Sequence, residues 1–175
     1  MAVLTDTNIF VRLPQPHHAQ CGIAERALEF LRRREEILNV TSQNLIELWA
    51  VATRPFGENG LGLSTDQAGK ELDQIRRLWV LVPDVPLFAE WERLVRLHGV
   101  SGKSTHDTRL VAAMNMHGIG TILTFNVKDF VRYPGIISPC STRRTLAGNS
   151  RSAASVCRRF PMDRISSSGS HRTSA

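Results

Sequence analysis

Residues 99–107, GVSGKSTHD, admit two incompatible interpretations, and the fold depends on which one holds. The GKS triplet matches the end of a phosphate-binding loop, which requires another glycine at position 97 and must join a strand to a helix. Position 97 is Leu97, and residues 87–98 have the apolar spacing of a helix. Both requirements fail, so we interpret Gly99 and Gly102 as the turn between two helices.

The helix after this turn carries an acidic residue where its pattern calls for an apolar one. Leu110, Val111 and Met114 follow Asp107 at the third, fourth and seventh positions, so the carboxylate is expected to continue a buried stripe. A buried charge is costly without a partner. The first turn of a helix favours an anion, and Asp107 is therefore a candidate site residue.

Outward from this helix, β-rich apolar runs alternate with segments of helical periodicity. Strands are expected over residues 2–5, 37–40, 80–82 and 121–124. Helices are expected over residues 19–34, 42–53 (capped by Thr41 or Ser42), 64–79, 87–98 and 104–117. This alternation favours a single α/β domain with a central parallel sheet of four to five strands, right-handed crossovers and flanking helices.

Three more acidic residues map to one edge of that sheet. Asp6 directly follows the first strand, and Asp129 follows the last. Glu47 is the only charged residue in the stretch LIELWAVAT, residues 45–53, which is apolar nearly all round and is therefore expected to be buried. The carboxyl ends of parallel strands and the amino ends of the next helices share the edge where ligands bind. We expect these acids and Asp107 to meet there.

Four carboxylates gathered in one crevice repel one another and raise each other's pKa unless a cation lies among them. Oxygen ligands without cysteine or clustered histidine suit Mg²⁺ or Mn²⁺ better than Zn²⁺. Such an ion can generate hydroxide from bound water and neutralise charge on a phosphoryl group. The pattern therefore predicts phosphodiester hydrolysis.

Composition divides the chain into a body and a tail. The 175 residues, 42% hydrophobic, suffice for one domain, expected over residues 1–137. The net charge of +6 lies in residues 138–175, which hold seven arginines, ten serines and one acid, Asp163. We expect this tail to be disordered, either as a solvated extension or as an aid in holding an anionic partner.

Cysteine usage and hydropathy indicate the compartment. The three cysteines lack paired spacing, so neither a disulfide framework nor a zinc site is expected. No apolar run approaches the length of a membrane span, and no signal peptide is evident at the amino terminus. We expect a cytoplasmic protein.

Four segments, VLTDTNIF, NLIELWAV, HDTRLVAAM and ILTFNVKDF, resemble in order and spacing the signatures of PIN-domain ribonucleases, particularly VapC-type toxins of bacterial toxin–antitoxin pairs. The resemblance covers about residues 2–137. It implies a parallel sheet flanked by helices and an acidic quartet that holds Mg²⁺ or Mn²⁺. The implied ligands are Asp6, Glu47, Asp107 and Asp129, and the implied supporting polar residues are Thr7, Asn8, Thr124 and Asn126.

This sequence departs from the family pattern in two places. Some members place the fourth acid where Asn126 stands, so Asp129 is a direct ligand, a water-mediated ligand or a loop cap. The tail after Ser138 has no counterpart in the pattern.

The family further implies an endoribonuclease that acts on RNA, forms a homodimer and is inhibited by a cognate antitoxin. Because the body is neutral, RNA contacts would depend on local cations such as Arg12, Lys103 and Arg109. A PIN-like module that binds RNA or protein without cutting is the main alternative.

Two phosphatase classes fit the sequence less well. A haloacid-dehalogenase-like enzyme needs a second aspartate where Asn8 stands. A phosphohydrolase using His106 and Asp107 would be all-helical, with more nearby histidines than His98.

Overall fold

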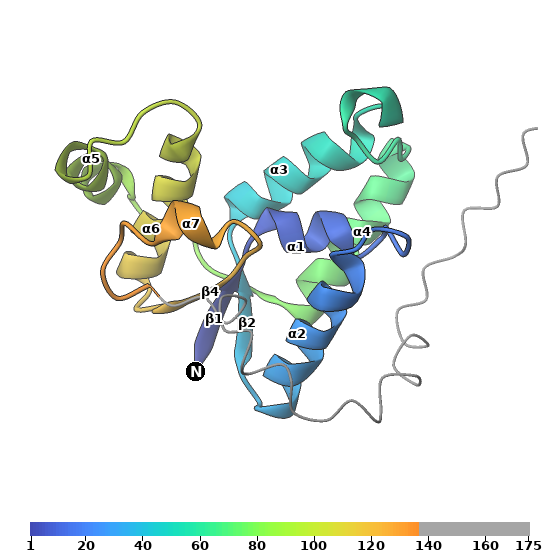
Figure 1. The fold of residues 1–175 in the computed structure, drawn as a ribbon, viewed down its shortest axis with the longest axis horizontal. Coiled ribbons are helices and arrows are strands. Elements are labelled where there is room, and N and C mark those ends of the chain that lie inside the picture. The colour runs from blue at the N-terminus through green and yellow to red at the C-terminus, as the bar shows by residue number, and fades with distance from the viewer. Residues whose placement is uncertain (137–175) are drawn as a thin grey trace, which may run out of the picture.

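The sheet forms as the pattern predicts. The computed structural model describes residues 1–136, so the tail predicted over residues 138–175 lies outside the described residues. The strands are β1 (Ala2–Thr5), β2 (Ile37–Val40), β3 (Val80–Leu81) and β4 (Thr121–Leu123). They pair in parallel in the order β3-β2-β1-β4 (Figure 1). The predicted α/β class with a parallel sheet is confirmed.

The long helices begin and end within two residues of their predicted limits. They are α2 (Cys21–Arg33), α3 (Ser42–Thr53), α4 (Thr65–Leu78), α5 (Phe88–Leu97) and α6 (Ser104–Met116). Capping explains two of the starts, because Thr41 and Asn44 form a reciprocal capping box on α3, as Ser64 and Gln67 do on α4. Three short elements were not predicted: α1 (Thr7–Arg12), the 3₁₀ helix η1 (Phe56–Glu58) and α7 (Val127–Phe130).

The helices cover the sheet in two layers, which lie on either side of the strands in Figure 1. Val3 of β1 packs into one core with residues of α1 to α4, whereas its neighbour Leu4 packs into a second core with residues of α5 to α7. Successive side chains of a strand point to opposite faces, so β1 supplies both cores. We call these the first layer (α1–α4) and the second layer (α5–α7).

An indole hydrogen bond locks the first layer onto the sheet. Trp79, at the end of α4, is 4% exposed and donates from Nε1 to Thr5 Oγ1 at 2.8 Å. Its ring also packs edge-to-face on Phe10, with centroids 5.1 Å apart. Both contacts act directly beside the end of β1.

The structure corrects the predicted burial of α3. Ile46 is 69% exposed and Trp49 is 37% exposed, so this helix is not buried all round. It packs mainly on α1 and α4 and projects away from the sheet (Figure 1), so only the side bearing Leu45 and Leu48 is covered. Asp107 also differs from expectation: it is half-buried, whereas Leu110 and Val111 beyond it are buried.

Residues 98–103 form the turn between two helices, as the sequence predicts. Gly99 and Gly102 have φ of 56° and 59°, a region that glycine enters without strain, and they connect α5 to α6. A phosphate-binding loop would need a strand where α5 stands. Among residues 1–136, no helix has the length and apolar character required to cross a membrane.

Candidate active site

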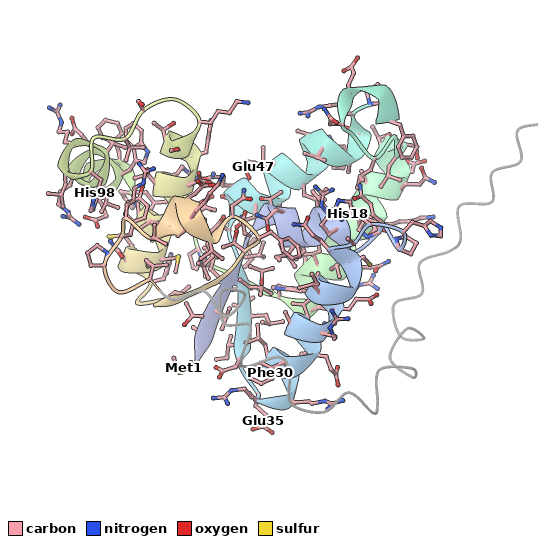
Figure 2. The ribbon with its side chains drawn as sticks, in the orientation of Figure 1. Met1, His18, Phe30, Glu35, Glu47 and His98 are labelled. Carbon is pink, nitrogen blue, oxygen red and sulfur yellow. The ribbon has the colours of Figure 1, made fainter. Side chains whose placement is uncertain are left out.

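The four predicted acids come from four different helices or helix caps. Asp6 follows β1 and is the N-cap of α1, while Asp107 lies in the first turn of α6 and Asp129 in α7. Glu47 lies in α3, near the end of that helix that approaches α6 and α7 (Figures 1 and 2). The first layer thus supplies Asp6 and Glu47, and the second supplies Asp107 and Asp129.

Electrostatic coupling joins the four carboxylates. Burial is the main cause that raises the pKa of Asp6 from 3.8 to about 6, and the negative charges of Asp107 and Glu47 raise it further. Burial also raises the pKa of Asp107, as do the charges of Asp129 and Glu47, whereas His106 and Arg132 lower it. The structure therefore brings Asp6, Glu47 and Asp107 within electrostatic reach of one another, across the boundary between the layers, and Asp129 within reach of Asp107.

A polar network holds Asp6 from the neighbouring strand. Asn8 Nδ2 donates to Asp6 Oδ2 at 2.7 Å, and Thr124 Oγ1 donates to the same oxygen at 2.6 Å. Asn8 in turn accepts the backbone N–H of Phe125 at 3.2 Å. Asn126 contributes its backbone N–H to Thr124 Oγ1 at 3.0 Å, and its own side chain is exposed. The carboxylate of Asp6 is thus fixed by groups from both ends of the described chain.

A second network holds Glu47. Thr7 Oγ1 donates to Glu47 Oε2 at 2.7 Å, and Gln43 Nε2 donates to Glu47 Oε1 at 2.8 Å. Asn44 Nδ2 donates to Thr7 Oγ1 at 3.2 Å. Sequence reasoning missed Gln43 and Asn44. Helical spacing could have indicated Gln43, four residues before Glu47, and the capping position three residues after Thr41 could have indicated Asn44.

Cations do not neutralise these acids directly. None of the ion pairs in the described part of the chain includes any of the four, and no side chain within residues 1–136 donates a hydrogen bond to Asp107 or Asp129. The three cations predicted to contact RNA lie in three different environments. Arg12 is hydrogen-bonded to Gln15 and Gln20, Lys103 is exposed beside the start of α6, and Arg109 binds Gln43.

The donor set fits a hard divalent cation. All four acids offer oxygen, and none of them forms an ion pair with a cationic side chain of the described residues, although His106 and Arg132 partly offset the negative charge around Asp107. No three His, Cys, Asp or Glu side chains among residues 1–136 form a ready cage for an ion. Mg²⁺ keeps several of its waters and needs only one or two carboxylates, so a hydrated ion suits this arrangement better than a closed cage does.

The raised pKa of Asp6 predicts how the stability of the metal-free protein depends on pH. Because the pKa of Asp6 is raised on folding, its protonated form contributes stability. This contribution is complete below pH 3.8 and is lost as the pH rises through about 6. We expect Asp6 to lower the free energy of unfolding by about 1 kcal/mol between pH 5 and pH 7. Urea unfolding with a chelator, run in parallel on Asp6→Asn, isolates this contribution. Equal changes in both proteins would contradict it.

Comparison with known proteins identifies the fold. No protein-family model matches the sequence, and the search of curated proteins found no match. Solved structures do match: VapBC2 from Rickettsia felis at 21% identity and TM-score 0.56, covering 79% of this chain and 97% of that one. VapC20 from Mycobacterium tuberculosis, a sarcin–ricin loop cleaving toxin, matches at 20% identity and TM-score 0.54, covering 73% and 92%. VapBC-1 from nontypeable Haemophilus influenzae matches at 20% and 0.56, covering 79% and 96%. The described part of this chain therefore has the PIN-domain fold of VapC toxins.

Proposed function

We propose that this protein is a Mg²⁺- or Mn²⁺-dependent endoribonuclease and the toxin of a toxin–antitoxin pair. The observation that carries the proposal is the convergence of Asp6, Glu47, Asp107 and Asp129: the neighbouring carboxylates help to raise the pKa of Asp6 and Asp107, and none of the four has an ion-pair partner among the described residues. The shared fold and the neighbour that is a sarcin–ricin loop cleaving toxin support it. Membership of the VapC family is part of the proposal.

In this proposal Asp6, Glu47 and Asp107 bind the ion, and Asp129 binds it directly or through water. When bound, the ion supplies a hydroxide at neutral pH and stabilises charge on the phosphoryl group. The protein's own part is orientation. Asn8 and Thr124 hold Asp6 Oδ2, and Thr7 holds Glu47 Oε2, so both carboxylates are kept in place before substrate arrives.

The partners follow from the same proposal. Two of the neighbours are VapBC assemblies, which supports a cognate antitoxin for this chain. A homodimer and a cytoplasmic location are further parts of the proposal. Lys103, which is exposed beside the start of α6 that carries Asp107, is well placed to attract an RNA phosphate.

A non-catalytic PIN-like module that binds RNA or protein is the second candidate. The observation that favours it is that the described side chains form no ready metal cage. Against it, repulsion among carboxylates that have no ion-pair partner destabilises a fold that has no use for an ion.

Cleavage of RNA by the purified full chain tests the two candidates. We expect a structured RNA to be cut in Mn²⁺ or Mg²⁺, cutting to stop in EDTA, and a DNA of the same sequence to survive. Sequencing of RNA ends after brief induction in cells would then locate the target. Binding of RNA with no cleavage in either ion would favour the non-catalytic module.

A further inference from the structure

The side-chain amide of Gln43 lies between the two layers of the site. Gln43 is only 8% exposed and occupies the first turn of α3, four residues before Glu47. Its Nε2 donates to Glu47 Oε1 at 2.8 Å and to the backbone carbonyl of His106 at 3.1 Å. Its Oε1 accepts from Arg109 Nη1 at 2.9 Å. Both N–H groups of this buried amide therefore donate, and its oxygen accepts one hydrogen bond.

The chemistry of the neighbours fixes the orientation of this amide. Carboxylate and carbonyl oxygens only accept hydrogen bonds, so the NH₂ group must face Glu47 and His106, while a guanidinium only donates, so the amide oxygen must face Arg109. A glutamate here would add a further negative charge against Glu47. A leucine would leave the His106 carbonyl and the Arg109 guanidinium without this partner.

The bridge joins parts of the site that otherwise touch little. Helix α3 packs mainly on α1 and α4, whereas α6 packs on α5 and α7. The His106 carbonyl belongs to the peptide bond that leads into Asp107. One amide therefore connects the carboxylate of Glu47 with the backbone that carries Asp107, from the first layer to the second.

Arg109 acts on the site through this amide. No ion pair among residues 1–136 joins Arg109 to a carboxylate. A direct arginine pair would occupy the oxygens of Glu47 and cancel the charge that an ion needs. With Gln43 in between, the guanidinium donates to the amide oxygen, and the amide, not the guanidinium, contacts the carboxylate of Glu47.

We propose that Gln43 is a positioning residue that sets the separation between Glu47 and Asp107 so that both can serve one divalent ion, and that Arg109 acts through Gln43 rather than on RNA. This inference rests on the proposed function. Outer-shell partners of metal ligands typically change ion affinity by ten- to a hundredfold, which gives the expected size of the effect.

The test measures Mn²⁺ affinity of the full chain by calorimetry without RNA. Gln43→Leu is expected to weaken binding roughly ten- to a hundredfold, and Arg109→Ala to weaken it less. The double variant should bind as weakly as Gln43→Leu alone, because the two side chains act as one unit. Arg109→Lys, which keeps a donor for Gln43 Oε1, should restore most of the affinity. In the cleavage assay, Gln43→Leu and Arg109→Ala should each lower kcat and leave KM for RNA unchanged.

Gln20→Leu is the matched control, since it removes another glutamine that accepts from an arginine, Arg12, away from the acids. It should leave Mn²⁺ affinity unchanged. Circular dichroism and thermal melting check that each variant folds, and Arg109→Ala carries the test if Gln43→Leu does not fold.

The outcomes separate the inference from the proposed function. If the wild-type chain binds Mn²⁺ but Gln43→Leu or a folded Arg109→Ala binds it equally well, the positioning role is wrong and the nuclease proposal stands. If Arg109→Ala raises KM for RNA and its effect adds to that of Gln43→Leu, Arg109 contacts RNA instead. If the wild-type chain binds no Mn²⁺, the proposed function fails, and the inference fails with it.

Discussion

Replacing Asp6 with asparagine is expected to abolish RNA cleavage while making the metal-free protein more stable. An ion held by carboxylates supplies several kcal/mol of transition-state stabilisation, so loss of this ligand should slow cleavage by about a thousandfold or more. The raised pKa of Asp6, from 3.8 to about 6, means that its charged form is held at a cost in the fold. Removing that charge should add about 1–2 kcal/mol to the free energy of unfolding at pH 7.

The expected gain in the free energy of unfolding is smaller than the full pKa shift implies, because asparagine replaces one acceptor oxygen of the carboxylate with an NH₂ donor. Its remaining oxygen can still accept from Asn8 and Thr124, but the NH₂ group cannot accept the backbone N–H of Thr7. Asp73→Asn, on the exposed side of α4, is the matched control and should change neither the rate of RNA cleavage nor the free energy of unfolding. Cleavage retained at the wild-type rate in Asp6→Asn would remove Asp6 from the active site.

Addition of Mn²⁺ is expected to stabilise the protein strongly. An ion that binds only the folded state stabilises it by mass action, by about 2.7 kcal/mol at one hundred times the dissociation constant. For a domain of this size the melting temperature should rise on the order of 5–10 °C. EDTA should reverse the change, and Mg²⁺ should act in the same direction.

Two variants show whether the ion binds at the proposed place. Asp6→Asn and Asp107→Asn should each remove most of the Mn²⁺-dependent rise, whereas Asp73→Asn should keep it. Potassium chloride at equal ionic strength controls for screening of the carboxylates. A melting temperature that does not respond to saturating Mn²⁺ would sink the metal site, and with it the hydrolytic mechanism.

Much of the fold could be predicted because its signals are local. The apolar run before Asp6 has strand length, and the spacing of Leu110, Val111 and Met114 indicates a helix face. The rule that parallel strands end at one edge then placed Asp6, Glu47, Asp107 and Asp129 together without knowledge of any contact. Their roles as ligands stay a prediction.

Other features could not be predicted because they depend on neighbours. The apolar sequence of α3 does not reveal that two helices, α1 and α4, provide most of its cover, so the exposure of Ile46 and Trp49 could not be predicted. Helices α1 and α7, of six and four residues, are shorter than the window in which periodicity can be read. The link between Gln43 and Arg109 spans 66 residues of sequence and arises only when the two layers meet.

The division of the acids between the two layers ties the site to the cooperativity of the whole domain. A fluctuation that parts the second layer from the sheet carries Asp107 and Asp129 away from Asp6 and Glu47, and it relaxes their mutual repulsion. If the proposed function holds, neither layer alone keeps all four acids, so no fragment or partly unfolded form should cleave RNA. A bound ion opposes that parting, and amide hydrogen exchange should slow in α6 and β1 together when the ion is present.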